Sequence, residues 1–167
     1  MKVMEKLCAH VLPVLIAALL AGCGRADAPK PGTSGKHEHK PPHGGTPVVL
    51  GNEEYHLELV LDGAAGRLQA YVLDGELENF IRVPEGSFEI HAKLPSKSET
   101  LVFRAVASSA TGETVADTSL FEAQADWLKA TTAFDAVLKE LIVRGRKYEN
   151  VAFNFPKGND IDEKENK

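Results

Sequence analysis

Four histidines in the first third of the chain are the residues best suited to chemistry. His37, His39 and His43 lie in a polar stretch rich in Gly, Pro and Lys, and His56 follows in an alternating apolar and polar segment. Imidazole nitrogen is a ligand suited to Zn, Cu or Ni, and side chains two residues apart on an extended chain project to the same side. The spacing of His37 and His39 therefore favours a transition-metal site, with His43 as a third ring.

A metal site formed by His37, His39 and His43 would be more rigid with a further ligand on a folded element. His56 and Glu58 are expected to share the polar face of one strand, so they could close the site from the domain side, with Glu58 in a supporting role. The alternative is a hydrophilic segment that merely contains histidines, because no rigid spacing enforces ligation and Lys36 and Lys40 place positive charge beside the site. Both interpretations stay open.

No catalytic set emerges from the other polar residues. The serine pair at Ser108 and Ser109 lacks a nucleophile elbow and an evident His and Asp partner. The carboxylates of the first strands are expected to be solvated strand and turn residues rather than an acid and base pair. They are Glu54, Glu58, Asp62 and Asp74. We therefore expect a protein that is not an enzyme.

The first 23 residues have the layout of a secretory signal. Lys2 and Lys6 precede an apolar run over 11–20, and Leu20-Ala21-Gly22-Cys23 follows. The run is too short for a membrane-spanning helix, which needs about 20 apolar residues. The ending resembles the bacterial lipobox, which implies a signal peptide over 1–22, cleavage before Cys23 and lipidation of that cysteine.

The lipobox has consequences for location and composition. A lipid on Cys23 anchors the chain to a membrane of the cell envelope, and Gly24, where some bacteria use Asp to retain lipoproteins in the inner membrane, favours the outer membrane facing the periplasm. Cys8 leaves with the signal, so no internal disulfide is expected. The formal charge of −5 for the whole chain argues against nucleic acid as a partner.

The rest of the chain divides by composition. Residues 23–47 are rich in His, Pro and Gly and are expected to form a lipidated flexible tether, and 157–167 is expected to be a charged disordered tail. Between them, 48–156 has the size of one domain, with apolar residues at every second position in many segments. These segments predict an all-β fold, an antiparallel sandwich or partly closed barrel of seven to eight short strands.

One stretch admits two interpretations. Phe134, Val137, Leu138, Leu141 and Ile142 fall at helical spacing, so a helix over 132–143 competes with a strand that closes the last hairpin. We expect at most one short helix near 125–138, with Trp127 packed on the sheet.

The segment Pro42-His43-Gly44-Gly45, followed by 55–59 and 71–75, resembles a group of small uncharacterised bacterial lipoproteins. The His-Gly-Gly start and the following strand are also similar to the beginning of some periplasmic adaptor subunits of heavy-metal RND efflux pumps. The resemblance implies an extracytoplasmic β domain with a link to divalent metals, and only His43 and His56 map onto the shared motif.

These observations favour an envelope lipoprotein that binds or buffers Zn, Cu or Ni as an accessory to efflux. Its expected partners are the membrane, through the lipid, and an envelope or efflux protein. The alternative is a structural or protein-interaction module without catalysis, in which the tether is only a spacer.

Overall fold

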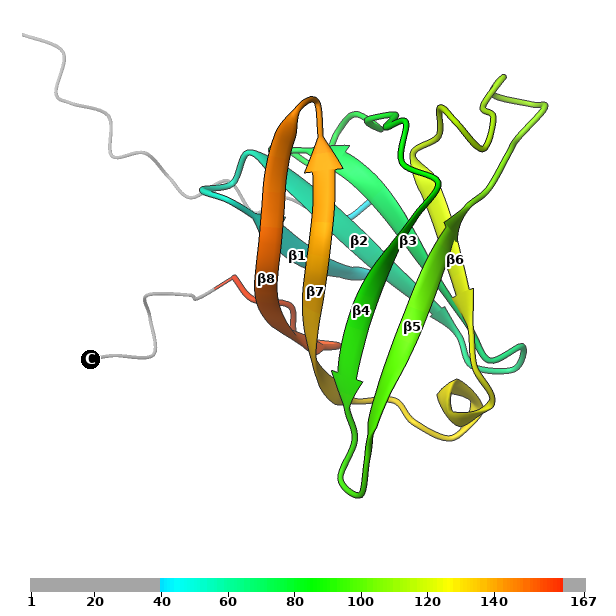
Figure 1. Cartoon of the computed structure of the whole chain (residues 1–167), viewed down its shortest axis with the longest axis vertical. Helices are drawn as coiled ribbons and strands as arrows, with labels where there is room; N and C mark the ends of the chain where they lie inside the picture. Colours follow the sequence, from blue (N-terminus) through cyan, green and yellow to red (C-terminus); the bar gives the residue numbers. More distant parts are fainter. Residues whose placement is uncertain (1–39, 161–167) are drawn as a thin grey trace, which may run out of the picture. The chain divides into compact units, whose positions relative to one another are not determined.

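The structure, a computed structural model, describes residues 40–160. Within this range the chain forms eight strands and one turn of 3-10 helix, η1 (Figure 1). The elements, in chain order, are β1 (Thr46–Leu50), β2 (Tyr55–Asp62), β3 (Arg67–Asp74), β4 (Ser87–Lys93), β5 (Ser98–Ala105), β6 (Leu120–Gln124), η1 (Asp126–Lys129), β7 (Phe134–Val143) and β8 (Arg146–Phe155). Within residues 40–160, no helix is long and apolar enough to cross a membrane.

The eight strands form a single antiparallel sheet in the order β1-β2-β3-β6-β5-β4-β7-β8, which curls until β1 approaches β8 (Figure 1). The predicted all-β fold is therefore confirmed, in its partly closed barrel form. The short helical piece expected near 125–138 is η1, and Trp127 within it packs edge-on against Phe134 with ring centroids 5.3 Å apart.

The core follows from the alternation of side chains along each strand. In β4, Phe88, Ile90 and Ala92 are buried while the residues between them are exposed. Because successive strand residues point to opposite faces, this pattern turns one face of every strand into the barrel interior. Phe103 of β5 and Phe121 of β6 are fully buried there.

The seam between β1 and β8 is closed by the segment after β8. The side-chain oxygen of Asn159 accepts a bond from the Val49 amide at 2.7 Å, and its Nδ2 donates to the Val49 carbonyl at 3.2 Å. The Thr46 hydroxyl donates to the Pro156 carbonyl at 3.1 Å. Asn159 thus supplies the two hydrogen bonds that a neighbouring strand would make with β1.

The stretch with helical spacing is a strand with a shift in its pattern. Leu138 of β7 pairs with Val151 of β8 and Glu140 pairs with Glu149, so Lys139 and Asn150 are both left out of the register. This moves the inward positions of β7 from Leu138 to Leu141, three residues on, which imitates a helical repeat. The strand interpretation of 134–143 is correct, and the helix is excluded.

The folded part is wider than the expected domain of 48–156. Pro41–Gly45 lies on the outer face of β2, and Gly158 is buried against β1. Phe80 to Val83 forms no strand and makes only isolated bridges, Leu73 with Phe80 and Val83 with Thr118. The expected domain boundaries therefore lie inside the region that packs.

Candidate functional site

A buried carboxylate on the outer face of β2 organises the candidate site. The Glu58 side chain is fully buried, although Leu57 and Leu59 beside it are the residues that point into the barrel. Its Oε1 accepts the backbone N–H of His43 at 2.7 Å and that of Gly45 at 2.9 Å. The expectation of a solvated Glu58 was wrong, because the segment before β1 folds back over this carboxylate.

The two glycines after His43 allow this fold-back. Gly44 has a φ of 67°, in the left-handed region that favours glycine. A Cβ on Gly45 would lie 2.6 Å from the Leu59 carbonyl oxygen and 2.8 Å from Cγ2 of Val60. The His-Gly-Gly sequence is therefore what brings two backbone donors within reach of Glu58.

The His43 ring is fixed on two sides. Its Nδ1 lies 2.7 Å from Oε2 of Glu58, and the ring stacks on Tyr71 with centroids 4.0 Å apart and an angle of 18° between planes. A carboxylate is an acceptor, so we assign the proton of the neutral ring to Nδ1, which leaves the lone pair on Nε2. The His43 side chain is 37% exposed, so solvent and solutes can reach it.

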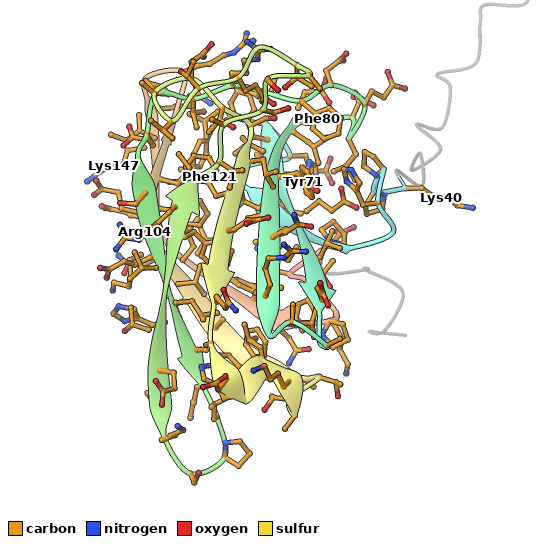
Figure 2. The ribbon with its side chains drawn as sticks, turned by 90° about the vertical axis from the view of Figure 1, so that its right-hand side faces the viewer. Lys40, Tyr71, Phe80, Arg104, Phe121 and Lys147 are labelled. Carbon is orange, nitrogen blue, oxygen red and sulfur yellow. The ribbon has the colours of Figure 1, made fainter. Side chains whose placement is uncertain are left out.

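Two aromatic rings complete the surface around His43. Phe80, which is 47% exposed, lies 5.7 Å from the His43 ring and 5.9 Å from Tyr71 between centroids. Tyr71 and Phe80 are labelled in Figure 2, on the same side of the barrel as Lys40. We call His43, Tyr71 and Phe80 the aromatic cluster.

Burial raises the pKa of the Tyr71 hydroxyl, and the negative charges of Glu58 and Glu122 raise it further. Loss of the phenolic proton would place a third negative charge near these carboxylates. Tyr71 therefore stays neutral beside Glu58 to higher pH than an exposed tyrosine.

His56 occupies a different environment. It is 6% exposed, and its Nδ1 lies 3.2 Å from the carbonyl oxygen of Asp74. The loop that begins at Asp74 is tightly bonded, because the Asp74 carboxylate accepts the backbone N–H groups of Glu78 and Asn79 and the Asn79 side-chain amide at 2.6 to 3.2 Å. Burial alone would raise the pKa of Asp74, but these bonds lower it overall.

The structure thus brings together two of the predicted site residues, His43 and Glu58. His56 is on the same outer face of β2, but its ring is buried and bonded to a backbone carbonyl. His37, His39 and Cys23 lie outside the described residues. Within 40–160, no three His, Cys, Asp or Glu side chains are grouped as a metal would require.

The aromatic members of the site were not anticipated from the sequence. Tyr71 alternates with inward residues of β3, so its place on the outer face could have been read from the pattern. Its pairing opposite Glu58 depends on the register between β2 and β3, which only the fold supplies.

No known protein family, curated protein or solved structure matches the chain.

Proposed function

We propose that this chain is an envelope lipoprotein that binds or buffers a divalent transition metal, Zn, Cu or Ni, without catalysing a reaction. The observation that carries the proposal is the His43 and Glu58 pair. A carboxylate that orients an imidazole through one nitrogen, leaving the other free, is the usual support of a metal-binding histidine. The ring is held, partly exposed, and has its Nε2 available.

A single imidazole from His43 is too few ligands to bind an ion tightly, so we include His37 and His39 as further ligands. They precede His43 by six and four residues. In this arrangement the barrel supplies one fixed imidazole and the preceding segment supplies the others. His56 has no ligand role in the proposal, because its ring is buried and its Nδ1 faces the Asp74 carbonyl.

Calorimetry with Zn²⁺, Cu²⁺ and Ni²⁺ tests the metal proposal. The full-length chain should carry Cys8→Ser and Cys23→Ser, so that no thiol competes for the ion. We expect binding that weakens by about tenfold or more in His43→Phe, which keeps a ring over Tyr71 but removes both nitrogens.

The matched control is His91→Phe, because His91 is an exposed histidine of β4 that lies 3.6 Å from Glu89. This variant should bind as the parent chain does. Absence of binding for all three ions, or equal affinities of His43→Phe and the parent, would contradict the proposal.

The envelope location has its own test. In a bacterial host that processes lipoproteins, the protein should appear in the membrane fraction, and mass spectrometry should find acyl chains on an N-terminal Cys23. Cys23→Ser should move the protein to the soluble fraction or leave the signal uncleaved. Membrane association of Cys23→Ser with an intact lipid mass would contradict lipidation at this residue.

A second candidate function is a non-catalytic interaction module, and the exposure of Phe80 favours it. Large aromatic side chains that remain exposed beside other rings are typical of contact surfaces. Replacing His37, His39 and His43 should then leave partner capture in place, whereas Phe80→Ala should reduce it. Loss of capture with the histidines alone would assign the contact to the metal.

A further inference from the structure

Part of β5, a strand inside the sheet between β6 and β4, has an open edge. This strand pairs with β4 from Ser98 to Arg104, but it pairs with β6 at Arg104 and Ala105 only. Beyond that point β5 and β6 diverge. Ala123 and Gln124 of β6 pair with β3 only, and the chain then turns into η1, while β5 lies along β4 as far as their hairpin (Figures 1 and 2).

The direction of the backbone groups along β5 follows from three hydrogen bonds. The Lys97 carbonyl accepts from Leu94 at 2.8 Å and the Ala105 amide donates to Gly86 at 3.0 Å, so odd-numbered residues of β5 face β4. The Val106 amide donates to Leu120 at 2.9 Å, so even-numbered residues face the β6 side. The register with β4 is continuous between these points.

It follows that Ser98, Thr100 and Val102 direct their N–H and C=O groups to the side that β6 has left. Among the described residues, none hydrogen-bonds to these backbone groups. Thr100 and Ser98 are exposed, and Val102 is 38% exposed, so solvent reaches this edge.

The edge of β1, one of the two terminal strands of the sheet, is protected by contrast. In β1 the edge-facing residues are Pro47, which has no N–H, and Val49, whose N–H and C=O are both taken by Asn159. Natural sheets usually protect an edge in such ways, or with lysines and bulges. Ser98, Thr100 and Val102 themselves include no Pro, Lys or bulge, and Thr and Val have high strand propensity.

The barrel interior is sealed beneath this edge. Leu101 is 2% exposed and Phe103 is fully buried, so the core needs no further strand to cover it. An added strand would therefore pair through its backbone at the surface and would leave the barrel unchanged.

The charges near the edge select the kind of strand. Arg104 and Lys93 flank the two ends of the edge, and among the described residues neither forms an ion pair, although Glu122 of β6 lies opposite Arg104. A strand antiparallel to β5 would run in the direction of β6 and end beside Ser98, where Lys93 is the cross-strand neighbour. An acidic segment fits this end.

We propose that the β5 edge, Ser98 to Val102, binds an extended acidic segment of a partner protein as an added antiparallel strand. This binding is independent of the metal proposal. A second copy of the chain fits less well. Antiparallel self-pairing centred on Thr100 would place Arg104 of one copy across from the hairpin end of the other, next to Lys97.

The test uses 15N-labelled full-length chain and a synthetic peptide, acetyl-Thr-Val-Thr-Val-Asp-Glu-amide. The amides of Ser98, Thr100 and Val102 should shift on titration and become protected from hydrogen exchange. In the free chain these amides should exchange faster than those of Leu101 and Phe103, which bond to β4. A peptide ending in Lys-Lys should bind at least about fivefold more weakly.

Two variants at one position separate backbone pairing from side-chain contact. Thr100→Pro removes an edge-facing N–H that the β4 ladder does not use, so the fold should persist and peptide affinity should fall about tenfold. Thr100→Val keeps the N–H and should bind as the parent does. Val115→Pro, at an exposed loop valine, controls for proline elsewhere.

Three results would overturn the proposal. The first is absence of shifts at the edge amides up to millimolar peptide. The second is equal binding by Thr100→Pro and Thr100→Val. The third is concentration-dependent dimers of the chain that Thr100→Pro abolishes, which would assign the edge to a second copy.

Discussion

Replacing Glu58 with Gln changes the proton position on His43 while leaving the shape of the site nearly intact. The glutamine oxygen can still accept the backbone N–H groups of His43 and Gly45, which lie 2.7 and 2.9 Å from Oε1. Its NH₂ group then faces Nδ1 in place of Oε2, at the site of the 2.7 Å contact. An NH₂ group donates, so Nδ1 must become the acceptor and the proton moves to Nε2.

The cost in stability comes from the lost charge. Hydrogen bonds to charged groups contribute about 1.5 to 3 kcal/mol each, against about 1 kcal/mol for neutral ones. In Glu58→Gln, three hydrogen bonds to a fully buried, charged carboxylate become hydrogen bonds to a neutral amide. The free-energy penalty for burying the charge is removed at the same time. We expect a net loss of about 1 to 3 kcal/mol, or a fall in Tm of roughly 4 °C for each kcal/mol.

Two measurements check this reasoning. Long-range 1H–15N spectra of the imidazole nitrogens should show the protonated nitrogen of His43 change from Nδ1 to Nε2, and calorimetry should show at least about tenfold weaker metal binding. Glu89→Gln is the matched control, since Glu89 also lies beside a histidine, His91, but is exposed. A His43 that keeps its proton on Nδ1 in Glu58→Gln would refute the assignment of roles in the pair.

Four further predictions concern the fold around the site. Gly45→Ala should lower the free energy of unfolding by about 1 to 3 kcal/mol in chemical denaturation, because its Cβ would meet the Leu59 carbonyl at 2.6 Å, whereas Gly63→Ala, with no atom within 4 Å, should change it little. Asn159→Ala should cost about 1 to 3 kcal/mol and speed hydrogen exchange of the Val49 amide, and an unchanged exchange rate would argue against the seam described above. Tyr71 should ionise above the ordinary tyrosine range in an ultraviolet titration, because its pKa is raised in the folded state. The contribution of Tyr71 to stability is therefore complete below the ordinary tyrosine pKa and is lost as pH rises through the folded value. Burial alone would raise the pKa of Glu113, but hydrogen bonds from Thr111 and Ser119 lower it overall. The contribution of Glu113 to stability is therefore present above the ordinary glutamate pKa and is lost as pH falls through the lower folded value. Glu113→Gln should accordingly reduce the loss of stability that acid causes in a pH series of unfolding measurements.

The sequence predicted most of the strands, because alternation of apolar and polar residues is a local property. β4 shows why, because its buried positions repeat every second residue without interruption. β7 was ambiguous for an equally physical reason. The shift at Lys139, opposite Asn150, moves the inward side by one residue and produces a helical spacing in a strand.

The candidate site was only partly predictable. His43 and Glu58 were both identified, but their contact depends on Gly44 and Gly45 folding the chain back onto β2, and no periodicity reports a turn of this kind. For the same reason Glu58 was expected to be solvated. Asn159 was placed in a charged tail because its role is a contact with β1, 110 positions away in the sequence.

The free edge of β5 could not have been read from the sequence either. It depends on how far β6 pairs with β5, and on whether the odd- or even-numbered residues of β5 direct their backbone N–H and C=O groups to β4. Both are properties of the strand register. The residues of the edge look like those of any half-buried strand.

Substoichiometric Cu²⁺ added to the 15N-labelled, cysteine-free full-length chain tests whether His43 binds metal, because the paramagnetic ion broadens resonances near its binding site. We expect the broadening to centre on His43 and to extend to Tyr71 and Phe80, which share the aromatic cluster. His91, on β4, should stay sharp. Broadening centred on His91 or His56, or uniform loss of signal across the barrel, would contradict the assignment of His43 as the metal-binding residue of the folded domain.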